Sequence, residues 1–152
     1  MITVRAMEKE DIQRVIDFEW ELRRQEPDTY YWEPDEAYAM QLEQSFADPR
    51  FNTAISLIAL KDERVIGRID ASLISSRSDA ACTSAYLDWL CVLKSERHQK
   101  TAQALLAALR AACRKQGASL LIALMANNGE AQRFYRHVES ASIHDTGIWM
   151  EL

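Results

Sequence analysis

The sequence contains no acidic residue between Arg97 and Gly129, although Asp and Glu make up 23 of its 152 residues. It also lacks any apolar run long enough to cross a bilayer, and its first residues, MITVRAMEKED, do not have the pattern of a signal peptide. Internal repeats and low-complexity linkers are missing too. At this length, these absences predict one domain over residues 1–152 and no membrane association.

Cysteine is scarce, and the three histidines are scattered without the spacing of metal ligands. The cysteines are odd in number, widely spaced and each in an apolar context, which favours free buried thiols in a reducing cytoplasm. A catalytic thiol is the minor alternative. We therefore expect a cytoplasmic protein with no disulfide and no metal. The cysteines are Cys82, Cys91 and Cys113.

The composition is that of an ordinary folded protein, with 48% apolar and 27% charged residues. The formal net charge of −5 argues against non-specific binding to nucleic acid.

The acid-free stretch joins a basic loop to an amphipathic helix. The first N–H groups of a helix are unpaired and its dipole favours negative charge, so such a loop is a natural anion site. We interpret it as a phosphate-binding turn; the alternative is a solvated loop before a capped helix. The cations of the stretch are Arg97, Lys100, Arg110, Arg114 and Lys115, and the expected buried stripe of the helix is Ala102, Leu105, Leu106, Leu109, Ala112 and Cys113.

Hydrophobic periodicity and turn signals predict α+β architecture: a mixed sheet with helices on both faces. The apolar run at 120–125 is expected inside the sheet, parallel to the strand before it. The expected order is a strand at 2–5, a helix from 8 to before Pro27, a helix from 34 or 35 to 46, three strands at 54–60, 65–73 and 85–93, a helix ending at Gly117, a strand at 120–125, a helix at 130–137, and one or two terminal strands within 142–152.

Two segments carry a resemblance to the GNAT superfamily of acyl-CoA N-acyltransferases, and the order of elements agrees with it over nearly the whole chain. The strand AYLDWLCV followed by RHQKTAQALL looks like the family's fourth strand and its Arg/Gln-x-x-Gly-x-Gly/Ala turn. The later NNGEAQRFYRH looks like the family's Asn…Ala…Phe-Tyr segment. The resemblance implies a GNAT-like fold and transfer of an acetyl group from acetyl-CoA directly to a primary amine, without a metal.

Residue by residue, the resemblance implies a pyrophosphate cradle at the turn and backbone contacts to the thioester and pantetheine at the strand end. The implied cofactor-binding residues are Cys91, Val92, Arg97, His98, Gln99, Lys100, Thr101, Ala102, Gln103, Asn127 and Asn128.

Lys100 stands where the family's turn has its first glycine, and His98 where glycine is also common. The charge of Lys100 can add affinity for the diphosphate, or its bulk can obstruct it. A GNAT-like domain that binds coenzyme A or another ligand without turnover, or that serves as a protein-interaction module, is therefore the alternative function.

Tyr135 takes the position of the general acid that protonates the leaving thiolate; a tyrosine packed at a helix end is the alternative. The amine must lose a proton before it attacks, and a carboxylate is the expected base. Asp88 and Glu21 are our candidates, with Glu19 and Glu33 also open.

An aromatic, acidic segment lies where the family's acceptor-binding loop falls. Aromatic faces and carboxylates together suit an amine-bearing acceptor, either a small molecule or a peptide. Packing on the core or on a partner subunit is the alternative, and a homodimer is left open. The implied substrate residues are Tyr30, Tyr31, Trp32 and Glu33.

Overall fold

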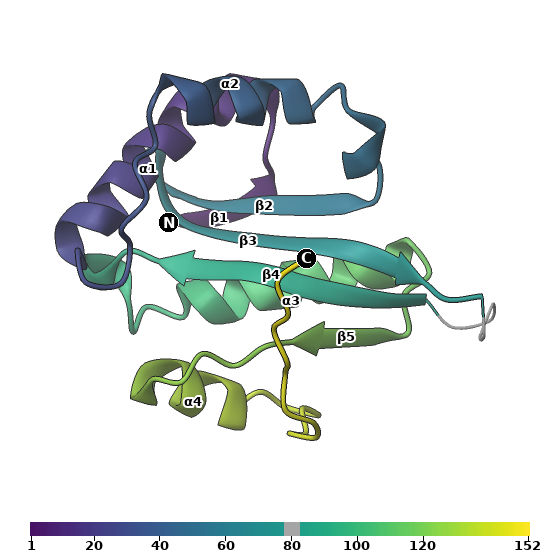
Figure 1. Cartoon of the computed structure of the whole chain (residues 1–152). Coiled ribbons are helices and arrows are strands. Elements are labelled where there is room, and N and C mark those ends of the chain that lie inside the picture. The colour runs from purple at the N-terminus through teal and green to yellow at the C-terminus, as the bar shows by residue number, and fades with distance from the viewer. Residues whose placement is uncertain (78–82) are drawn as a thin grey trace. The chain divides into compact units, whose positions relative to one another are not determined.

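The computed structural model describes residues 1–77 and 83–152, and Figure 1 shows its helices and strands. Cys82 and the second half of the polar loop expected at 75–80 lie outside the described residues. The elements are β1 (Ile2–Ala6), η1 (Lys9–Asp11), α1 (Ile12–Gln25), α2 (Glu36–Ser45), η2 (Pro49–Phe51), β2 (Ala54–Lys61), β3 (Arg64–Ser75), β4 (Thr83–Val92), η3 (Lys94–Glu96), α3 (Thr101–Lys115), β5 (Leu120–Ala123) and α4 (Gly129–Arg136).

The described chain divides into two compact units, Met1–Ile122 and Ala123–Leu152. The first unit contains a sheet in the order β1-β2-β3-β4-β5. Its first four strands are antiparallel neighbours, and the arrows of β4 and β5 point the same way in Figure 1. Antiparallel strands followed by one helical crossover give the mixed sheet that the periodicity predicts.

The side chains of β3 point alternately toward α3 on one face of the sheet and toward α1 on the other. Gly67 faces α3, because a Cβ added there would lie 3.0 Å from Leu105 Cδ1. The next residue, Arg68, faces α1 and bonds to Glu19 of that helix. Successive side chains of a strand point to opposite faces, so the predicted alternation along β3 is confirmed and leaves Arg68 and Asp70 on the α1 side.

Helix α3 buries Leu105, Leu106, Leu109 and Cys113 of the predicted stripe, and Thr101 as well, while Ala102 and Ala112 are only partly buried. Its end is also as predicted, because Gly117 follows with φ 88°, the left-handed backbone that terminates many helices.

The β2–β3 connection is a two-residue turn at Asp62 and Glu63, where φ is 49° and 62°. Positive φ at both central positions matches the twist of a hairpin, so this polar turn forms although it contains no glycine.

Two expectations about the end of the sheet are wrong. The strand expected inside the sheet, β5, is short and lies at its edge, with Leu120 and Ile122 exposed. Residues 142–152, which the structure describes throughout, form no strand.

The second unit contains α4 and the extended residues after it. The side chain of Asn128 caps α4 by accepting from the N–H of Ala131 at 2.8 Å, as the Asn127–Asn128–Gly129 turn predicts.

Within the described part of the chain, no helix combines the length and apolar character that a membrane crossing needs. Cys91 and Cys113 are buried free thiols.

Candidate active site

Strand β4 contains a bulge at the middle of its pairing with β3. Asp70 pairs with Trp89 and Ala71 with Leu87, so Asp88 has no opposite residue among the described residues of β3. A bulge bends its strand and redirects a side chain. Asp88 is consequently exposed, whereas Cys91 and Val92 further along β4 are buried. Burial raises the pKa of the Cys91 thiol, which opposes a role as a catalytic thiolate.

The turn between β4 and α3 is held by Arg97. Its Nε donates to the carbonyl oxygen of Val92 at 3.2 Å, and its Nη1 donates to Glu26 at the end of α1 at 3.1 Å. Both charged side chains are only 18% exposed. The first cation of the predicted cradle is therefore already paired with a carboxylate.

A second pair of contacts connects the same two segments. The backbone N–H of Ser95 donates to Gln25 Oε1 at 3.1 Å, and Gln25 Nε2 donates to Ser95 Oγ at 3.2 Å. Since Gln25 ends α1, the start of the aromatic loop and the start of the turn are bonded side by side.

His98 and Lys100 both have φ 63°, in the left-handed region. Left-handed backbone costs a residue with a Cβ roughly 1–2 kcal/mol, and glycine avoids that cost. This left-handed backbone explains why glycine suits these two positions of the turn. His98 and Lys100 adopt the same backbone at a conformational cost.

The N-terminus of α3 is open to an anion. Lys100 occupies the cap position, and among the described residues no side chain caps the helix and no acid lies in its first turn. Thr101 is buried, whereas Gln99 is exposed and donates to Glu96 at 3.2 Å. Ala102 is partly exposed, and Gln103 and Lys100 are exposed, so this turn offers an anion its backbone N–H groups and the ammonium of Lys100.

The aromatic loop folds onto β4. Trp32 lies edge-on to Trp89, with ring centroids 5.2 Å apart, and Tyr30 contacts both rings at 5.4 and 6.0 Å. Of the other implied substrate residues, Tyr31 is 82% exposed and Glu33 is paired with Arg23 at 3.0 Å. The structure brings Tyr30 and Trp32 together with the strand and leaves Tyr31 apart from this cluster.

Beneath the rings lies a buried polar network centred on Glu19, which is 2% exposed. Its carboxylate accepts from Trp32 Nε1 at 3.1 Å, from Tyr38 Oη at 2.7 Å and from Arg68 Nη1 at 2.7 Å. Arg68 Nε also lies 2.7 Å from Asp70. Burial alone would lower the pKa of Arg68, but the charges of Asp70 and Glu19 and the bonded Tyr38 raise it.

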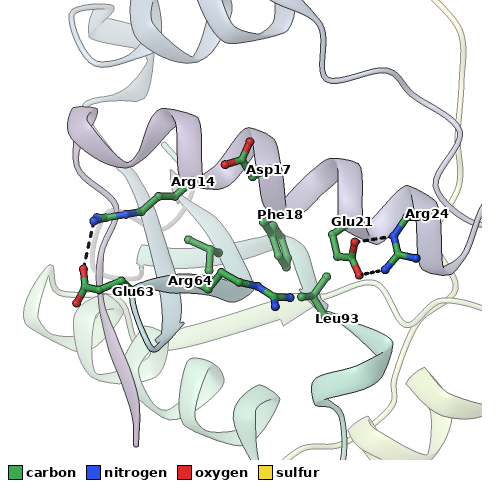
Figure 2. A pocket seen from close by; sticks show the side chains of 9 residues that line it. Arg14, Asp17, Phe18, Glu21, Arg24, Glu63, Arg64 and Leu93 are labelled. Atoms are coloured by element: carbon green, nitrogen blue, oxygen red, sulfur yellow. Dashed lines mark hydrogen bonds and ion pairs between the residues drawn. The ribbon is translucent and has the colours of Figure 1, made fainter.

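Glu21, one of the two candidate bases, lies elsewhere. It lines a pocket of about 430 Å³ between α1 and the start of β3, and Figure 2 shows its carboxylate bonded to Arg24. This hydrogen bond, helped by Gln25, lowers the pKa of Glu21 to about 2. A carboxylate that binds protons so weakly is a poor general base at neutral pH.

The second unit contains the remaining implied residues. Asn128 is the α4 cap, and Asn127 accepts from Gln132 at 3.2 Å. Tyr135 lies on α4, partly buried beside Phe134 with ring centroids 5.2 Å apart. Burial raises the pKa of Tyr135, so its phenol is protonated at neutral pH and able to donate.

Among residues 1–77 and 83–152, no three His, Cys, Asp or Glu side chains are grouped as a metal site would need.

Three features of the candidate site were not predicted from the sequence. They are the place of Trp89 in the aromatic cluster, the pairing of Glu26 with Arg97, and the hydrogen-bond network around Glu19. A signal existed for the network, because the polar residues Arg68 and Asp70 alternate along one face of an otherwise apolar strand.

Comparison with known proteins identifies the class. Residues 12–138 match the model of the Acetyltransferase (GNAT) family, so the chain belongs to that family, and the resemblance seen in its motifs is confirmed. Family and fold together support an acyltransferase. No curated protein matches the chain in sequence.

Solved structures share the fold at low identity. An aminoglycoside acetyltransferase from an uncultured soil metagenomic sample, in complex with sisomicin, is 14% identical with a TM-score of 0.81, covering 99% of this chain and 96% of that one. A ribosomal-protein-alanine N-acetyltransferase from Brucella melitensis biovar Abortus 2308 is 16% identical with a TM-score of 0.75, covering 99% of each chain. A predicted acetyltransferase with acetyl-CoA from Clostridium acetobutylicum is 17% identical with a TM-score of 0.69, covering 100% of this chain and 96% of that one.

Proposed function

We propose that this chain is an N-acetyltransferase that transfers the acetyl group of acetyl-CoA directly to a primary amine. The observation that carries the proposal is the turn before α3, where two left-handed residues precede an uncapped helix N-terminus directly after the bulged strand β4. Backbone N–H groups there suit a diphosphate, and membership of the GNAT family supports coenzyme A as the molecule that carries it.

Within this proposal, the turn from Arg97 to Gln103 holds the pyrophosphate, and the end of β4 at Cys91 and Val92 offers backbone groups to the thioester. Asn127 and Asn128 remain proposed cofactor contacts. Holding acetyl donor and amine together supplies much of the acceleration, because proximity converts a bimolecular reaction into an effectively unimolecular one.

Two side chains take chemical roles. Tyr135 donates its phenolic proton to the leaving thiolate, consistent with its protonated state at neutral pH. Asp88 takes up the proton of the attacking ammonium, directly or through water. Its exposed position at the bulge favours it over Glu21, whose carboxylate is occupied by Arg24.

The acceptor is proposed to be a small-molecule or peptide amine bound at the aromatic loop. Structural neighbours include acetyltransferases of aminoglycosides and of a ribosomal protein, so the fold is compatible with both kinds of acceptor. A cytoplasmic location and a single functional domain over residues 1–152 complete the proposal.

Calorimetry with acetyl-CoA, followed by thiol release across a panel of amines, tests the reaction. Binding with amine-dependent release supports the enzyme. Binding without release across the panel favours the non-catalytic ligand-binding alternative, and no binding favours the interaction module. In the active protein, Tyr135→Phe should lower kcat about 10²-fold or more with the Kd for acetyl-CoA unchanged, and an unchanged kcat would remove the role of the phenol.

A further inference from the structure

The buried carboxylate of Glu19 is fully engaged by three donors from three different segments. One is Trp32 in the loop after α1, one is Tyr38 on α2, and one is Arg68 on β3. A carboxylate enclosed in this way at 2% exposure is not placed to collect a proton from an arriving amine. Its evident effect is on its donors, because it holds each of them in one orientation.

Of the three donors, Trp32 is the one whose fixed orientation affects an exposed surface. Its indole N–H points inward to Glu19, and its carbonyl oxygen accepts from Arg23 at 3.4 Å. With the N–H edge fixed, the ring stays in edge contact with Trp89 and Tyr30. All three rings remain partly exposed, so they form one aromatic surface, and Trp89 sits next to the bulge residue Asp88.

We propose that Glu19 is a positioning residue, which fixes Trp32 so that Tyr30, Trp32 and Trp89 together bind a cationic group of the acceptor. This inference rests on the proposed function and deepens it by naming a substrate class. The faces of tryptophan and tyrosine attract cations.

The cation held here is not the reacting nitrogen. An amine attacks the thioester only as the neutral base, so a surface that favours a positive charge would oppose the reaction at that nitrogen. The acceptor therefore carries a second amino group, which stays protonated on the aromatic surface while the first one reacts. Diamines and other polyamino compounds form this class.

The test uses two probes with the same carbon chain, 1,4-diaminobutane, which is protonated at pH 7, and the neutral 1,4-butanediol, titrated by calorimetry into the full chain at pH 7. We expect the diamine to bind about tenfold more tightly, as one cation on an aromatic surface allows. Trp32→Phe and Glu19→Gln should each reduce the affinity for the diamine about fivefold, with the Kd for acetyl-CoA unchanged. Tyr38→Phe is the matched control, because it removes a donor to the same carboxylate but no ring from the surface; it should change the affinity for the diamine less than about twofold.

A double-variant cycle separates positioning from general stabilisation. If Glu19 acts through Trp32, the variant with both changes loses no more affinity than either single variant. Three results would each overturn the proposal: additive losses in the double variant, equal affinity of the wild-type chain for the two probes, or an unchanged affinity of Trp32→Phe for the diamine. If Glu19→Gln does not fold, the comparison of Trp32→Phe with Tyr38→Phe decides it. Failure of the proposed enzyme is a separate result, because it shows in the acetyl-CoA titration and in thiol release, on which the amine titrations do not depend.

Discussion

Replacing Lys100 by glycine tests both the backbone and the charge of the turn before α3. Lys100 has φ 63°, which costs a residue with a Cβ roughly 1–2 kcal/mol. Glycine removes this cost but gives the unfolded chain more freedom, worth about 0.4–1 kcal/mol against folding. We therefore expect Lys100→Gly to raise the free energy of unfolding by about 0.5–1 kcal/mol, or the Tm by roughly 2 °C for a chain of this size.

The same substitution should weaken the binding of coenzyme A although it stabilises the fold. Lys100 is exposed at the N-terminus of α3, where its ammonium adds to the attraction for a diphosphate. We expect Lys100→Gly to bind coenzyme A about three- to fivefold more weakly at low salt, with the difference shrinking as ionic strength rises.

Thermal unfolding and calorimetry at two salt concentrations provide the assay. His98→Gly is the matched control, because His98 has the same φ and no permanent charge: it should stabilise the chain without weakening binding. Destabilisation by both glycines would refute the backbone argument. Tighter binding of coenzyme A to Lys100→Gly would refute the charge argument and show that the side chain obstructs the turn.

Three further predictions follow from packing and ion pairs. Asp11 is buried with two arginine partners, which hold the pKa of its carboxyl well below its usual range; Asp11→Asn should cost about 2 kcal/mol at pH 7. The cost should shrink below about pH 4, because the carboxyl of the unfolded chain then binds a proton while the native carboxylate stays ionised, and urea unfolding over a pH series measures it. An equal cost at pH 7 and pH 2.5 would contradict this linkage. Gly67→Ala should destabilise by about 1–2 kcal/mol, since the new Cβ would lie 3.0 Å from Leu105 Cδ1, and a neutral effect on Tm would show that α3 yields there. Glu26→Gln should tighten coenzyme A binding several-fold by releasing Arg97 from its carboxylate, and calorimetry showing weaker binding would mean that the pair is needed to shape the turn.

Local patterns in the sequence determined the elements of the first unit and the place of its turn. The alternation in β3, the stripe of α3 and the stop at Gly117 depend on neighbours a few residues apart, and all three are present in the structure. The acid-free stretch likewise predicted the turn before α3, whose helix start has no side-chain cap and no acid in its first turn; anion binding there stays a prediction.

Only the tertiary structure decided which distant residues meet. Glu19 and Arg68 are 49 residues apart, and Arg97 and Glu26 are 71 apart, so no local period announces either pair. The edge position of β5 was misjudged for the same reason: whether an apolar strand is covered depends on a partner from elsewhere in the chain, and residues 142–152 do not supply one as a strand. Hydrophobic period is a property of a segment, whereas pairing across a sheet or between a helix and a loop is a property of the folded chain.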